Sequence, residues 1–130
     1  MLDIVPPFNV PRRPSSDDLF TPDQRVALLA NGRRTAAGAD IDPHPVVKLF
    51  TPDANATWLL TEMDPHEPDR AFGLCDPGLG CPELGYVSLT ELRALQGPLG
   101  LLVEQDSGFV ADRPLSNYAA VSRHNGRIDV

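Results

Sequence analysis

The chain has 130 residues, of which 42% are hydrophobic, so it has the length and apolar content for one packed domain but not for two. It carries no apolar run near the ~20 residues of a membrane helix and no secretory signal at its start, so we expect a cytoplasmic protein without a membrane contact. The net charge is −7, and thirteen acids against three bases give residues 40–112 a charge of −10, which disfavours direct binding of nucleic acid.

The N-terminal part divides into a leader and a helix. Residues 1–18 hold four prolines, which remove backbone donors, so we expect a flexible Pro-rich leader followed by one α+β domain over residues 19–130. Thr21 offers an N-cap hydroxyl, Pro22 suits the first helical turn, and Gln24 completes a capping box, so a helix begins here. The pair Asn31-Gly32 predicts its end.

The rest of the chain reads as short strands followed by helices. β-forming residues between proline- and glycine-rich turns predict strands at 46–50, 57–63, 70–75 and 84–87, and the short connections favour an antiparallel meander. Ser88 and Glu91 predict a short helix, residues 101–104 and 109–111 a hairpin, and residues 115–126 a last helix. The expected fold is therefore α+β, with a mainly antiparallel sheet of four to six strands and about three helices packed on one face.

Four motifs in this order are specific enough to suggest a family: VVKLFTP at 46–52, ATWLLTE at 56–62, FGLCD at 72–76 and GCPELGYVSL at 80–89. Together they resemble the uncharacterised bacterial family called domain of unknown function 2958. The resemblance covers about residues 19–128. It implies a protein of conjugative plasmids and other mobile elements, and it carries no established activity over to this chain.

The segment 75–85 is the most distinctive part of the sequence. Its glycines and prolines specify the backbone path closely, which fits either a shaped connection between two strands or a binding loop. It lacks the lysine and the Ser/Thr of a phosphate-binding loop. The binding-loop candidates are Cys75, Asp76, Gly78, Gly80, Cys81, Glu83 and Gly85.

Catalytic and metal sites have little support in the sequence. Zinc on Cys75, Cys81, His44 and His66 would need short paired spacings that are absent, and the two cysteines are expected to stay reduced. A nucleophile such as Cys75 or Ser88 beside His66 has no spacing signature either. Trp58, Phe72 and Tyr86 are read as core residues. We therefore expect no cofactor, no metal and no catalytic residue.

A second group of candidates is acidic and consists of Glu62, Asp64, Glu67 and Asp69. Strand alternation places Glu62 and Asp64 on one face, where they form either a solvated surface or a contact for a basic partner. Our hypothesis is a non-enzymatic accessory protein of a mobile element that binds an unidentified protein partner through this acidic surface. A DNA-mimicking inhibitor of a host nuclease or defence complex is its most concrete form. The alternative is a small metal-dependent or hydrolytic enzyme centred on Cys75–Gly85.

Overall fold

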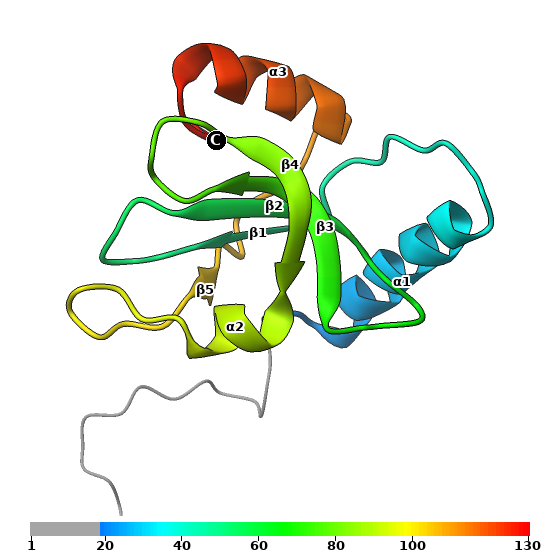
Figure 1. The fold of residues 1–130 in the computed structure, drawn as a ribbon, viewed down its shortest axis with the longest axis horizontal. Helices are drawn as coiled ribbons and strands as arrows, with labels where there is room; N and C mark the ends of the chain where they lie inside the picture. Colours follow the sequence, from blue (N-terminus) through cyan, green and yellow to red (C-terminus); the bar gives the residue numbers. More distant parts are fainter. Residues whose placement is uncertain (1–18) are drawn as a thin grey trace, which may run out of the picture.

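Residues 19–130, which the computed structural model describes, form one five-stranded antiparallel sheet with three helices (Figure 1). The strands lie in the order β4-β3-β2-β1-β5. The elements are α1 (Pro22–Ala36), β1 (Val47–Phe50), β2 (Thr57–Met63), β3 (Arg70–Asp76), β4 (Glu83–Ser88), α2 (Leu89–Ala94), β5 (Glu104–Gln105) and α3 (Leu115–Asn125). The α+β class and the antiparallel meander are confirmed, while the predicted leader at 1–18 lies outside the described residues.

Helix α1 begins as predicted and ends later. Thr21 and Gln24 form the capping box, but the helix continues through Asn31 and Gly32 to Ala36, so the predicted stop is wrong. Gly32 is needed for packing, because a Cβ at this position would lie 1.8 Å from the carbonyl oxygen of Met63. The Asn31 amide donates to the carbonyl of Thr61 at 2.9 Å. Strand β1 pairs with β2 only as far as Leu60, so α1 packs along β2 where β1 no longer does.

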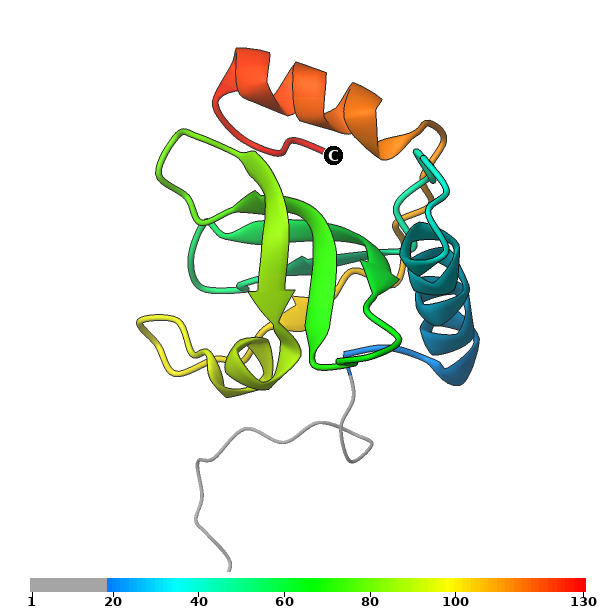
Figure 2. The ribbon, with the colours of Figure 1, turned by 45° about the vertical axis from the view of Figure 1, so that its right-hand side comes forward.

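The sheet is covered on both faces, which corrects the expectation that all helices share one face. Leu28 of α1 and Leu89 and Leu92 of α2 belong to one core, whereas α3 belongs to a second core with Leu59 and Leu74. Figure 2 shows α3 on the opposite side of the sheet from α2. The buried run Trp58–Leu60 sends side chains into both cores, as strands buried on both faces do.

The region after α2 differs from the prediction. The expected hairpin over 101–111 does not form; β5 instead pairs with β1, and Leu102 forms an isolated bridge with Gln96. Asp53 holds this region, because its Oδ2 accepts from the backbone amides of Leu99 and Leu101. The final helix is confirmed and ends at Gly126, whose φ of 77° suits glycine. None of the helices in residues 19–130 has the length and apolar character to cross a membrane.

The contact between α1 and β2 gives a first prediction. Alanine normally stabilises a helix relative to glycine, but Gly32→Ala should lower the free energy of unfolding by about 2 kcal/mol or more, because the added methyl overlaps the Met63 carbonyl. Gly85→Ala is the control, because a Cβ there meets nothing within 4 Å. Urea unfolding of both variants tests this, and an unchanged or higher midpoint for Gly32→Ala would contradict the packing.

Candidate functional site

The acidic candidates gather around the turn between β2 and β3, and two of them hold that turn together. Asp64 Oδ1 accepts from the backbone amide of His66 at 2.8 Å. Asp69 accepts from the side chain and amide of Thr90 and from the Ser88 hydroxyl, and these bonds lower its pKa. Glu67 is exposed at the tip of the turn. The turn is therefore fixed both to itself and to the start of α2.

A hollow of about 320 Å³ lies between this turn, the C-terminal end of α1 and strand β4. Its polar lining comes from Thr35, Glu62, Asp64, His66 and Tyr86. Because Gly32 brings α1 against β2, Thr35 one turn later reaches Glu62, and its hydroxyl donates to Glu62 Oε2 at 3.2 Å. The hollow thus collects two of the four acidic candidates with a histidine of the same turn and with a threonine and a tyrosine from distant parts of the chain.

Glu62 is the carboxylate whose electrostatics stand out in this hollow. Partial burial raises its pKa, the hydrogen bond from Thr35 opposes this rise, and the nearby charge of Asp64 adds to it. Among the residues that the structure describes, no lysine or arginine forms an ion pair with Glu62 or Asp64. The hollow therefore holds two carboxylates without a cationic partner from residues 19–130, an arrangement that favours a positively charged ligand.

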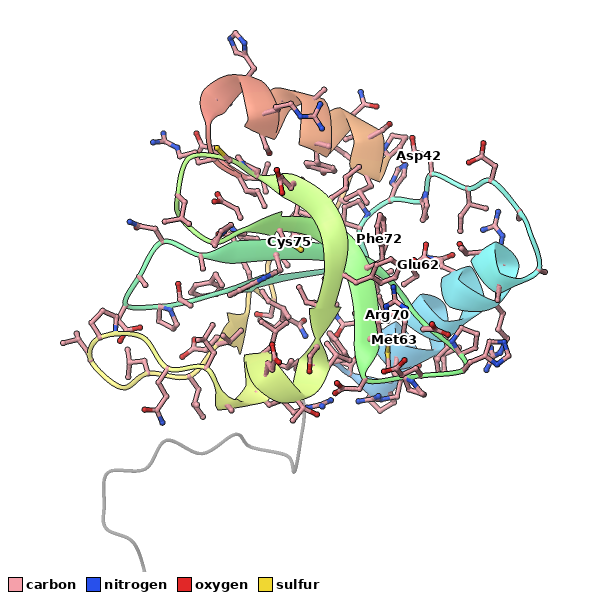
Figure 3. All side chains as sticks on the ribbon, in the orientation of Figure 1. Asp42, Glu62, Met63, Arg70, Phe72 and Cys75 are labelled. Carbon is pink, nitrogen blue, oxygen red and sulfur yellow. The ribbon has the colours of Figure 1, made fainter. Side chains whose placement is uncertain are left out.

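Beside the hollow, a row of side chains crosses three strands, and its two ends, Glu62 and Tyr86, line the hollow. Glu62, Phe72 and Tyr86 occupy paired positions on β2, β3 and β4, and the rings of Phe72 and Tyr86 meet edge to face with centroids 5.0 Å apart. The guanidinium carbon of Arg70 lies 3.8 Å from the Tyr86 ring centroid. In Figure 3, Glu62, Arg70 and Phe72 lie at the part of the sheet next to α1, and Cys75 lies further along β3.

Sequence reasoning missed part of this site. Tyr86 was expected in the core, but it is 51% exposed because β4 is an edge strand, and this corrects the prediction. Trp58 is confirmed as core, with 7% exposure. No spacing signal links Thr35 or Tyr86 to Glu62, since each reaches the hollow only through the docking of α1 or the pairing of β4.

The loop after β3 has a clear structural role. Asp76 is buried, and its two carboxylate oxygens accept from the backbone amides of Gly78 and Ile128, both at 2.9 Å. Gly78 and Gly80 have φ near +90°, which explains glycine at these two positions. Cys81 is exposed, whereas Glu83 and Gly85 belong to β4. Asp76, Gly78 and Gly80 therefore fix the path between β3 and β4, and Asp76 also anchors the backbone at Ile128.

A second hollow, of about 560 Å³, lies beside this loop. Asp76, Gly78 and Gly80 line it together with Lys48 and Arg127, which sequence reasoning did not select. The ammonium of Lys48 already lies 3.3 Å from Asp106 and also donates to the carbonyl of Val130. Arg127 lies 3.5 Å from Asp129. Both cations of this hollow are therefore paired within the chain.

The cysteines and histidines considered for catalysis or zinc are not brought together. Burial raises the pKa of Cys75 to about 11, and the residue packs against the core that contains Trp58. Its thiol therefore stays protonated at neutral pH, unlike a catalytic cysteine. Cys81 is exposed on the loop and His66 lines the smaller hollow. Within residues 19–130, no group of three or more His, Cys, Asp or Glu side chains is arranged to hold a metal ion.

Most acids of the central segment take part in contacts within the chain. Eight of its thirteen acids accept hydrogen bonds or form ion pairs inside the chain, at Asp42, Asp53, Glu62, Asp64, Asp69, Asp76, Asp106 and Asp112. Asp42, for example, accepts from the amide of Ser116 at the start of α3. Much of the −10 charge thus serves to hold loops and helix ends, whereas Glu62 and Asp64 share one hollow without an ion pair to a described lysine or arginine.

Comparison with known proteins identifies a family and adds no activity. The family model described as "Protein of unknown function (DUF2958)" matches residues 19–129. The chain belongs to this family, as the motif order predicted. No curated protein and no solved structure matches the chain.

The raised pKa of Glu62 predicts a stability difference that depends on pH. A raised folded-state pKa means that stability is lost as the pH rises through that pKa, so the charged Glu62 costs stability at neutral pH. Glu62→Gln, which can still accept from Thr35, should be more stable than the wild type at about pH 7, and the difference should shrink below about pH 4. Urea unfolding at both pH values measures this.

Glu67→Gln is the matched control, because it removes the same charge from an exposed position on the same turn. The interpretation of Glu62 would be wrong if Glu62→Gln were less stable than the wild type at neutral pH.

The two thiols should react very differently. At about pH 8, iodoacetamide should label Cys81 quickly and Cys75 only when the protein unfolds, because Cys75 is half-buried with a pKa of about 11. Mass spectrometry of the wild type and of Cys81→Ser checks this. Rapid labelling of Cys75 in folded Cys81→Ser would support the enzymatic alternative instead.

Proposed function

We propose that this protein is a non-enzymatic accessory protein of a mobile element that binds a protein partner in the cytoplasm, with the acidic hollow at Glu62 as the centre of the contact. The proposed contact surface is smaller than the whole acidic segment. It comprises Glu62 and Asp64 inside the hollow, with Glu67 and Asp69 on the adjoining turn.

The observation that carries the proposal is the half-buried Glu62 carboxylate beside Asp64. Burial and the like charge make ionised Glu62 unfavourable, and no described lysine or arginine compensates it. A partner's arginine or lysine side chain entering the hollow would supply that compensation, and a charge-assisted hydrogen bond to a partly buried carboxylate is among the stronger polar contacts. A residue that costs stability and faces a hollow fits a binding role.

The hollow is also suited in shape to one long basic side chain. Hydrogen bonds from the Thr35 hydroxyl to Glu62 and from the His66 amide to Asp64 already orient the two carboxylates, so little side-chain ordering is needed on binding. Tyr86 also lines the hollow, and because Arg70 already lies over its ring, the incoming side chain packs beside Tyr86 through its methylene stem. The most concrete form of the partner is a host nuclease or defence complex, whose nucleic-acid-binding surface is basic.

The enzymatic alternative has less support. The Cys75 thiol is protonated at neutral pH, and both Asp76 oxygens accept backbone amides, so neither group is poised to act on a substrate.

An affinity capture from the host with matched variants tests the proposed function. The double variant Glu62→Gln/Asp64→Asn keeps the acceptors for Thr35 and His66 but removes both charges, so it should lose the captured partner at least tenfold, as expected for truncating a charged contact. The control Glu104→Gln/Asp129→Asn removes the same net charge from exposed positions.

The wild-type interaction should also weaken as salt increases. An equal loss of captured partner in both double variants would indicate a general charge effect. Capture of the partner by Glu62→Gln/Asp64→Asn at the wild-type level would contradict the proposal. Thermal unfolding of each variant shows that the fold is intact.

A further inference from the structure

Strand β4 is an edge strand whose outer side pairs with no other strand of the described chain. It is the terminal strand of the sheet, and its outer side faces away from β3 in both ribbon views (Figures 1 and 2). The amide of Leu89 donates to the carbonyl of Asp69, which fixes the alternation of the β3–β4 ladder. By that alternation the amides and carbonyls of Leu84 and Tyr86 point to the outer side, unpaired within residues 19–130.

This edge lacks the usual devices that prevent strands from pairing with other chains. Such devices include lysine, proline, a bulge and very short strand length. The six residues of β4 contain no lysine, arginine or proline, and their register with β3 is regular. Leu84 and Tyr86 are 44% and 51% exposed on one face, and a Cβ at Gly85 between them would meet nothing within 4 Å.

We propose that two copies of this chain pair through β4, antiparallel, with the two-fold axis at Gly85. This register places the outward-pointing amide and carbonyl of Leu84 opposite those of the partner's Tyr86. The Tyr86 groups lie opposite those of the partner's Leu84 in the same way, so four backbone hydrogen bonds can form. It also makes two Leu84–Tyr86 cross-strand pairs on one face, a favourable aliphatic–aromatic combination. The two Gly85 residues meet on the other face without a side chain between them.

A second copy suits this edge better than an unrelated strand does, because the pairing is self-complementary and the paired strands themselves carry little charge. The chain carries −7 overall, so most of its surface would repel a copy of itself. Strand β4 carries one charge, Glu83. In the proposed register Glu83 faces the partner's Val87, and the two Glu83 side chains are about four residues apart, roughly 14 Å, which exceeds the Debye length at physiological salt.

The proposed dimer stands on different observations from the proposed partner binding, although Tyr86 contributes to both. Tyr86 lines the acidic hollow, so pairing through β4 would bring the two hollows to the same side of one continuous sheet. Two basic sites on one partner could then be engaged together. Because a six-residue edge buries less area than a standard interface, the dimer should form only as concentration rises.

Sedimentation equilibrium of the full chain over a concentration series tests the pairing. The wild type should shift from monomer to dimer with increasing concentration. Leu84→Lys should stay monomeric, because it places a lysine on the edge, and so should Tyr86→Pro, which removes an outward N–H while leaving the β3 ladder intact. Leu99→Lys is the control and should dimerise like the wild type, since Leu99 is 80% exposed and lies on a loop outside β4.

Circular dichroism shows whether Tyr86→Pro folds. If it does not fold, Leu84→Lys alone decides whether the dimer forms through β4. A wild-type chain that stays monomeric at sub-millimolar concentration would overturn the proposal, as would a dimer that survives Leu84→Lys. A monomer that still captures its partner through Glu62 would contradict the pairing and leave the proposed function standing.

Discussion

The close contact between Gly32 and the Met63 carbonyl determines how α1 is placed on the sheet. It allows α1 to pack against the part of β2 that does not pair with β1. The side-chain amide of Asn31 donates a hydrogen bond to the Thr61 carbonyl at this contact. The same contact brings Thr35 to Glu62 and so creates the hollow. The packing of α1 and the candidate site therefore depend on the same contact, and any side chain at position 32 would disturb both.

The acidic residues of this protein divide into two physical classes. Most of those in the central segment accept backbone or side-chain donors, as Asp53, Asp69 and Asp76 do, and so they fix loops that glycines and prolines leave without ladder bonds. Glu62 also accepts a hydrogen bond, from Thr35, but it belongs to the other class, because its surroundings raise its pKa and disfavour its charge. That contrast separates a candidate binding group from acids whose role is structural.

The sequence predicted local features well and the assembly of the site poorly. Strand β2 and the start of α1 were placed correctly because β-propensity and a capping box act over a few residues. Glu62 and Asp64 were selected, but Thr35 and Tyr86 were missed, since tertiary packing alone brings them together. Asn31-Gly32 was read as a helix stop, although glycine there serves close packing. The run Trp58–Leu60 already contained the signal for a sheet buried on both faces.

The central claim is that the hollow at Glu62 accepts a positively charged group. An NMR titration of the Glu62 side-chain carboxyl, with and without a short arginine-containing peptide, tests it most directly. In the free protein the pKa should lie above the ordinary value of a glutamate, and the peptide should lower it, because a nearby cation favours the ionised form. A pKa that is ordinary in the free protein, or that the peptide leaves unchanged at saturating concentration, would contradict the claim.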